Sequence, residues 1–254
     1  AQGIAKELPG LPPETQVLLI DVLAQRGPAV REAILDLGRA ATTSAVRAAV
    51  AKALGRIGDL ACVGWLAEVI AADAEAAEAA AQALVALPGD AISADVRRRL
   101  AEAAPAARSG LIDVLLRRQD AAAVPVLLDQ AGADEVAVRH AAFRALAGLA
   151  TPEHLPALLG RLLATPDDAS RADAERAVAA VARKATAGAG RSEAVLAALA
   201  RQADPGLRST LLRVLGGIGG PEALVAVRSR ITAATDADER NAAVKALAGW
   251  PDST

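Results

Sequence analysis

An apolar position recurs about every 31 residues along this chain, and this period constrains the fold more than any other feature. Segments similar to residues 46–59 (VRAAVAKALGRIGD) occur throughout, with their anchors at Leu23, Leu54, Leu84, Leu115, Leu146, Val181, Leu215 and Leu247. The successive spacings are 31, 30, 31, 31, 35, 34 and 32 residues. Such a period predicts repeats that bury their apolar faces against one another.

Each repeat contains two helical patterns. The anchor helix shows apolar residues at i, i+3, i+4, i+7 and i+8, as in residues 46–57. A second pattern precedes it, at 28–39, 60–71, 92–103, 121–131, 152–164, 190–202 and 221–232. Strand-type alternation is absent over any useful length. We therefore predict an all-α fold, an α-solenoid (α-α superhelix) of about eight stacked helical hairpins.

Alanine makes up 68 of the 254 residues, and many alanines recur at matching repeat positions. Examples are Ala48, Ala49, Ala53, Ala141, Ala142, Ala145, Ala242, Ala243 and Ala246. Alanine is the best helix former and its side chain is small, so these positions predict hairpins that stack at close distances.

We expect a single domain over residues 1–254, with an irregular repeat around 165–192 where the period lengthens through insertions around 165–169 and 186–192. The last anchor helix is followed by only a few residues and by no polar capping helix, so we also expect a fragment of a longer repeat protein. No apolar run approaches the ~20 residues of a membrane span.

The anchor helices resemble those of the HEAT-repeat family, in a short bacterial form similar to the HEAT-like repeats of phycobilisome lyases. The pattern V-R-x-A-A-x-x-A-L-x-x-[IL]-[GA] carries the resemblance, together with an aspartate before it in the fifth, seventh and eighth repeats. It covers nearly the whole chain. The patterns of tetratricopeptide and ankyrin repeats do not occur.

In that family, an arginine early in the second helix and an aspartate in the preceding turn form a hydrogen-bonded ladder between repeats. The resemblance implies this structural role for Arg47, Arg108, Arg139, Arg208 and Arg240, with Asp134, Asp204 and Asp236 as candidate partners. In the first, third and sixth repeats the arginine position holds Gln16, Ala77 and Ala174. We therefore expect an interrupted ladder.

The residues that usually carry chemistry are scarce. His140 and His154 are the only histidines and Cys62 is the only cysteine, without the spacing of a metal site. No nucleophile elbow, P-loop or dinucleotide fingerprint is present, and the His-Glu pairs of a HEAT-fold hydroxylase are missing. We expect no catalytic residue, metal or cofactor.

A polar groove is the remaining candidate site. In solenoids of this type the second helices line the concave face, and their side chains away from the apolar stripe become more basic toward the C-terminal end. The candidate partner-binding residues are His140, Arg144, Arg183, Arg213 and Lys245. A merely solvated helix face is the alternative, whereas a functional groove favours a carboxylate-rich partner.

We therefore expect a non-catalytic interaction scaffold that binds a protein, a peptide or another domain of the same chain. A HEAT-like enzyme, such as a bilin lyase or an alkyl-base DNA glycosylase, is the alternative. A designed repeat protein is a further one, against which the irregular repeats count. The formal net charge of −2, one phenylalanine and two tryptophans argue against a nucleic-acid surface.

Overall fold

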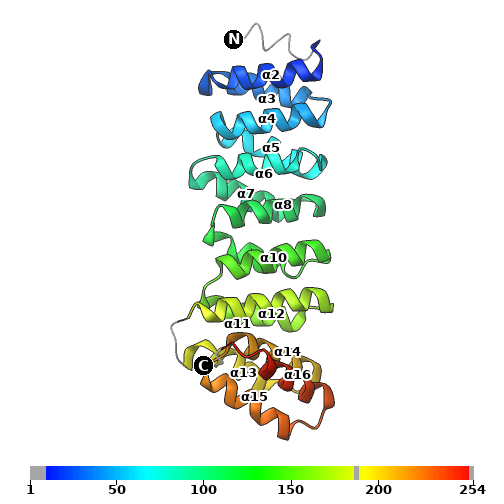
Figure 1. Ribbon diagram of the computed structural model, residues 1–254. Helices are drawn as coiled ribbons and strands as arrows, with labels where there is room; N and C mark the ends of the chain where they lie inside the picture. Colours follow the sequence, from blue (N-terminus) through cyan, green and yellow to red (C-terminus); the bar gives the residue numbers. More distant parts are fainter. Residues whose placement is uncertain (1–9, 186–188, 252–254) are drawn as a thin grey trace. The chain divides into compact units, whose positions relative to one another are not determined.

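The computed structural model describes residues 10–185 and 189–251, and these residues form helices and turns with no strand (Figure 1). The anchor helices become the second helices of the hairpins. They are α2 (Pro13–Ala24), α4 (Ser44–Ile57), α6 (Ala77–Ala86), α8 (Pro105–Arg117), α10 (Val136–Leu149), α12 (Asp168–Arg183), α14 (Pro205–Ile218) and α16 (Ala237–Ala248).

The first helices lie where the preceding patterns predict them. They are α3 (Arg31–Ala40), α5 (Val63–Ala72), α7 (Asp90–Glu102), α9 (Val124–Gln130), α11 (Leu155–Ala164), α13 (Glu193–Arg201) and α15 (Pro221–Ala233). Short 3-10 turns precede most of them: η2 (Gly27–Val30), η3 (Leu60–Cys62), η4 (Ala121–Ala123), η5 (Pro152–His154) and η6 (Ala189–Arg191). The prediction of an all-α fold is confirmed.

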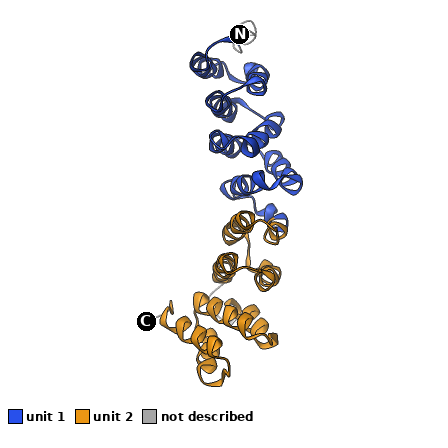
Figure 2. Ribbon diagram, turned by 90° about the vertical axis from the view of Figure 1, so that its right-hand side faces the viewer, with its two compact units in different colours: residues 1–126 blue, residues 127–254 orange. Residues whose placement is uncertain are grey.

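Contacts divide the chain into two compact units, residues 1–126 and 127–254 (Figure 2). In the first unit α2, α4, α6 and α8 pack in sequence, and α3, α5 and α7 each pack against the second helix that follows. In the second unit α10, α12, α14 and α16 pack in the same way, with α11, α13 and α15 beside them. Each unit is thus a stack of helical hairpins, the arrangement of an α-solenoid. That the whole chain is one domain stays a prediction.

Local sequence fixes where the second helices begin. The side chains of Thr43, Asp167, Asp204 and Asp236 each accept a hydrogen bond from the backbone N–H three residues later, which caps α4, α12, α14 and α16. The first residue of α8, α14 and α15 is a proline. A backbone N–H at this position has no acceptor within the helix, so its absence does not destabilise the helix.

Small residues allow the second helices to pack closely. Ala53, Ala142 and Ala243 are fully buried, as the alanine pattern predicts. At Gly216 in α14, an added Cβ would lie 2.8 Å from the Cβ of Ala246 in α16, so no larger residue fits without a shift. The leucine anchors of the inner repeats are buried beside these contacts and form the core.

The irregular sixth repeat differs from its prediction. The segment around 165–169 is not a long insertion, because Asp168 and Ala169 already belong to α12, which has 16 residues where α10 and α14 have 14. In α4 and α14 the anchor leucine lies eleven residues after the N-cap residue. In α12 the residue eleven positions after the N-cap is Val178, and not the predicted anchor Val181. Part of the second expected insertion, residues 186–188, lies outside the described residues.

Within the described ranges, no helix combines the length and the apolar character that crossing a membrane requires.

Candidate functional site

The ladder arginines occupy the fourth position after the N-cap of the second helices, and four of the five reach back to the loop before their own helix. Arg139 donates from Nη1 to the carbonyl oxygen of Ala133 at 2.7 Å. The same arrangement recurs as Arg47 to Ala41 at 3.1 Å, Arg108 to Ala103 at 2.9 Å and Arg240 to Ala234 at 2.8 Å. Each of these four arginines therefore satisfies a loop carbonyl that no helix bond satisfies.

Arg139 also joins two repeats, but through a partner that the sequence did not indicate. Its Nη2 pairs with Oδ2 of Asp167 at 2.5 Å, and its Nε donates to Oγ of Ser170 at 3.1 Å. Asp134, the expected carboxylate partner, contributes its backbone carbonyl oxygen at 2.7 Å instead. The expectation of an Arg139–Asp134 side-chain pair is corrected, because the Asp167 carboxylate caps the next second helix beside the guanidinium.

Two of the other ladder arginines also pair with acids of the following repeat. Arg47 pairs with Asp73 at 2.8 Å, and Arg208 pairs with the buried Glu239 at 3.0 Å. The candidate partners Asp204 and Asp236 instead serve as N-caps of α14 and α16. The structure thus brings arginines and acids together between repeats, with a different set of acids.

The sixth repeat contributes an arginine that the sequence alignment missed. Arg171 lies four residues after the N-cap Asp167 and donates to the Thr165 carbonyl oxygen at 2.9 Å, as the ladder arginines do. An anchor at Val181 puts Ala174 at the ladder position, seven residues earlier. Alignment on the N-cap aspartate identifies Arg171 instead.

Asp167 makes the ladder sensitive to acid. A hydrogen bond from the backbone N–H of Ser170, followed by that side chain's hydroxyl and by Arg139, lowers the pKa of Asp167 from 3.8 to about 2. Because the folded-state pKa is the lower one, this stabilisation is present above about pH 4 and is lost as the pH falls through 2. Asp167→Asn keeps the N-cap but cannot ionise. The difference in unfolding free energy by which wild type exceeds this variant should therefore become smaller between about pH 5 and pH 2. The urea concentrations at which the two proteins unfold measure this difference. If the difference is the same at pH 5 and at pH 2, ionised Asp167 does not stabilise the ladder.

Basic side chains also cap the C-terminal ends of neighbouring second helices. Arg118, beyond the end of α8, donates to the carbonyl oxygens of Leu84 at 2.7 Å and Leu87 at 2.6 Å. Lys184, beyond α12, donates from Nζ to those of Gly148 at 2.6 Å and Ala150 at 2.8 Å. Cations are favoured at helix C-termini, so these contacts hold adjacent repeats together. Burial lowers the pKa of both groups.

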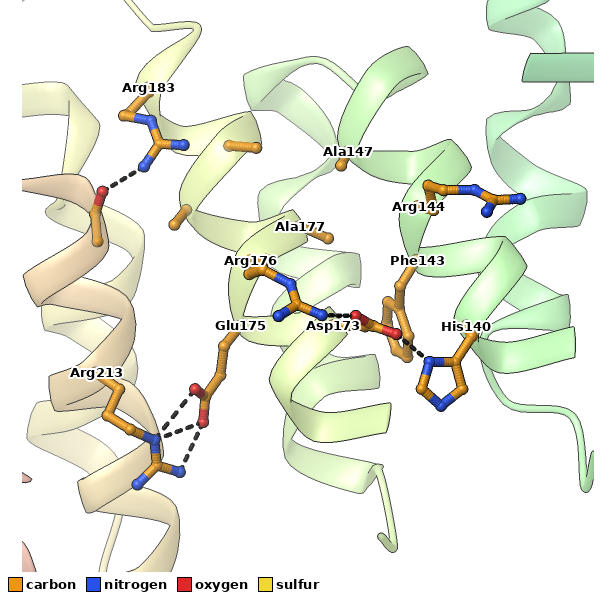
Figure 3. Close-up of a pocket in the computed structure, with 13 residues that line it drawn as sticks. His140, Phe143, Arg144, Ala147, Asp173, Glu175, Arg176, Ala177, Arg183 and Arg213 are labelled. Carbon is orange, nitrogen blue, oxygen red and sulfur yellow. Dashed lines mark hydrogen bonds and ion pairs between the residues drawn. The ribbon is translucent and has the colours of Figure 1, made fainter. Parts of the chain in front are cut away.

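An open hollow of about 680 Å³ crosses α10, α12 and α14 in the second unit (Figure 3). Its floor consists of Phe143 and of small residues, Ala147, Ala177, Ala179, Ala180 and Gly217. Its rim contains four of the five predicted groove residues, His140, Arg144, Arg183 and Arg213. The fifth, Lys245, lines a second hollow of about 700 Å³ over α12, α14 and α16, which Arg213 also borders.

The hollow also contains acidic residues, which are not among the five candidate partner-binding residues. Arg213 pairs with Glu175 through Nη2 at 2.6 Å and through Nε at 2.9 Å. Asp173 pairs with both His140 and Arg176, and Arg183 donates to the Gly217 carbonyl oxygen (Figure 3). The carboxylates are largely buried, and the Glu175 side chain is 16% exposed. The Arg176 side chain, by contrast, is 74% exposed. The hollow is therefore mixed in charge, with guanidinium groups outermost.

No group of three or more histidine, cysteine or acidic side chains within residues 10–185 and 189–251 could hold a metal ion. Cys62 is buried, and burial raises the pKa of its thiol. A buried thiol with a raised pKa is a weak nucleophile, so the chemistry of this residue is consistent with a packing role.

The stacked hairpins define an α-solenoid, and comparison with known families gives the particular class. Residues 93–179 match the sequence profile of HEAT repeats, which confirms the resemblance to this family over that stretch. A search of curated proteins found no sequence that matches the chain.

Three solved structures are similar to this chain at low TM-scores. An engineered protein is 24% identical, with 98% of this chain and 77% of that chain covered and a TM-score of 0.44. Human deoxyhypusine hydroxylase in complex with glycerol is 17% identical, with a TM-score of 0.38. The similarity covers 98% of this chain and 94% of the hydroxylase chain. A second engineered protein is 23% identical, with 98% and 95% covered and a TM-score of 0.32.

Proposed function

We propose that this chain is a non-catalytic interaction scaffold, and that it binds a protein or peptide segment in the hollow over α10, α12 and α14. The observation that carries the proposal is the hollow itself, whose floor of small apolar residues is ringed by ordered polar groups. Concave surfaces that combine an apolar floor with a few placed polar groups are the usual form of binding sites.

The stacking of the repeats supports the same proposal. Arg139 and Lys184 tie α10 and α12 together at both ends, so these two helices present their side chains from a fixed frame. A preorganised surface loses less conformational entropy on binding than a mobile one. Ala147, the partly exposed floor residue on α10, can therefore be substituted without changing the frame.

Filling the hollow tests the proposal. Ala147→Trp places a large side chain in the floor, whereas Ala157→Trp places the same side chain on the exposed face of the first helix α11. We expect proteins captured from an extract of the source cells by wild type and by Ala157→Trp to be lost with Ala147→Trp, while circular dichroism shows all three folded. If every captured protein is retained equally by Ala147→Trp, the hollow is not the binding surface.

A further inference from the structure

We infer that the hollow selects a peptide segment that carries carboxylates, with Arg213 as its preorganised donor; this inference rests on the proposed function. Four guanidinium groups and two carboxylates line the hollow, whereas the whole chain has a formal net charge of −2. The basic excess is therefore local to this surface. Opposite charge on a partner is what such a surface recognises.

The contacts of Arg213 hold its guanidinium in one orientation. Glu175 accepts hydrogen bonds from Nε and Nη2, and the hydroxyl of Thr210 accepts a third from Nη2 at 3.0 Å. Among the described residues, Nη1 makes no hydrogen bond, so its two N–H groups are available to a ligand. A planar guanidinium fixed in this way binds a carboxylate with little further loss of side-chain entropy.

The other arginines extend this donor along α12. Arg176 is 74% exposed above Asp173, and Arg183 uses Nη1 on the Gly217 carbonyl oxygen. These groups come from the middle and the end of one helix, while Arg213 comes from the next helix, so the donors are separated across the floor (Figure 3). Separated donors over an apolar floor fit a peptide in which acidic and apolar side chains alternate.

The same contacts disfavour nucleic acid as the ligand. Asp173 and Glu175 lie between the arginines, where they would repel a continuous phosphate backbone. Phe143 is fully buried, so apart from the imidazole of His140 the lining offers no exposed ring on which a base could stack.

Two matched peptides test the inference by fluorescence anisotropy at low salt: a labelled octapeptide of alternating leucine and glutamate, and its counterpart with glutamine in place of glutamate. Wild type should bind the glutamate peptide at least about fivefold more tightly than the glutamine peptide. Arg213→Gln should remove most of this preference, and Arg213→Lys should restore only part of it because lysine lacks the planar fork. Arg201→Gln, on the exposed face of the first helix α13, is the control and should behave as wild type.

Three results would overturn the inference: equal binding of the two peptides, binding of neither, or displacement of the glutamate peptide by a thymidine octanucleotide at concentrations equal to those of unlabelled peptide. If both peptides bind equally and Ala147→Trp abolishes both, the hollow still binds peptides and only the preference for carboxylates is wrong. That outcome separates this inference from the proposed function.

Discussion

Replacing Phe143 with alanine is expected to destabilise the protein by about 4 kcal/mol, because a buried phenylalanine is lost and leaves a cavity. Phe143 lies in α10, is fully buried and forms part of the floor of the hollow. It is the only phenylalanine in a chain whose core consists mostly of leucine, valine and alanine. Urea unfolding followed by circular dichroism measures the change.

Val225→Ala is the matched control for this substitution. Val225 is 69% exposed on the first helix α15, so its truncation should change stability by less than about 0.5 kcal/mol. Phe143→Leu should fall between the two variants, since it keeps most of the apolar contact. A Phe143→Ala protein with a wild-type unfolding midpoint would mean that the side chain is not in the core.

Replacing Arg139 with alanine is expected to cost about 3 kcal/mol, because it removes one partner of a largely buried charged network. The guanidinium is only 6% exposed and bonds to Asp167, Ser170 and two loop carbonyls. All of these groups lose a partner at once, and they come from two adjacent repeats. The loss should therefore loosen the packing of α10 against α12.

Arg176→Ala controls for the removal of an arginine as such. Arg176 also pairs with an aspartate but is 74% exposed, so its loss should change stability by less than about 1 kcal/mol. Arg139→Lys keeps the charge but cannot reach all four acceptors, and it should remain clearly less stable than wild type. If Arg139→Ala and Arg176→Ala unfold at the same urea concentration, the ladder does not stabilise the interface between repeats.

The sequence predicted the helices because their patterns are local. Apolar periodicity, N-cap aspartates and prolines act within one helix, and the structure places α11 and α15 where residues 152–164 and 221–232 indicated. Four of the five predicted groove residues line one hollow for a similar reason: their spacing along each second helix fixes the face on which they lie.

The acids that pair with the ladder arginines and with the groove residues could not be predicted from the sequence of one helix alone. The acid that meets a ladder arginine comes from the next repeat, at an N-cap position for Asp167 but three residues after the N-cap for Glu239. In the hollow, the register of Val181 already places Glu175 on the groove side of α12, but its pairing with Arg213 of the next repeat could not be derived from one helix. An acid 26 to 28 residues after the arginine, as for Asp73 after Arg47 and Asp167 after Arg139, is the signal that could have found two of them.

The ladder and the hollow use the two sides of the same helices. Asp167 at the start of α12 and Lys184 beyond its other end contact the preceding repeat, while Asp173, Glu175 and Arg176 line the hollow. Substitutions of exposed residues of the hollow, such as Arg176, can therefore alter binding without breaking the stack.

Amide hydrogen–deuterium exchange of the protein, with and without a partner captured by wild type and lost with Ala147→Trp, tests the central claim most directly. The account predicts slower exchange on binding in α10, α12 and α14 around Ala147, Ala177 and Gly217, with little change in the first helices α11, α13 and α15. Protection confined to those first helices, or to residues 10–126, would contradict it.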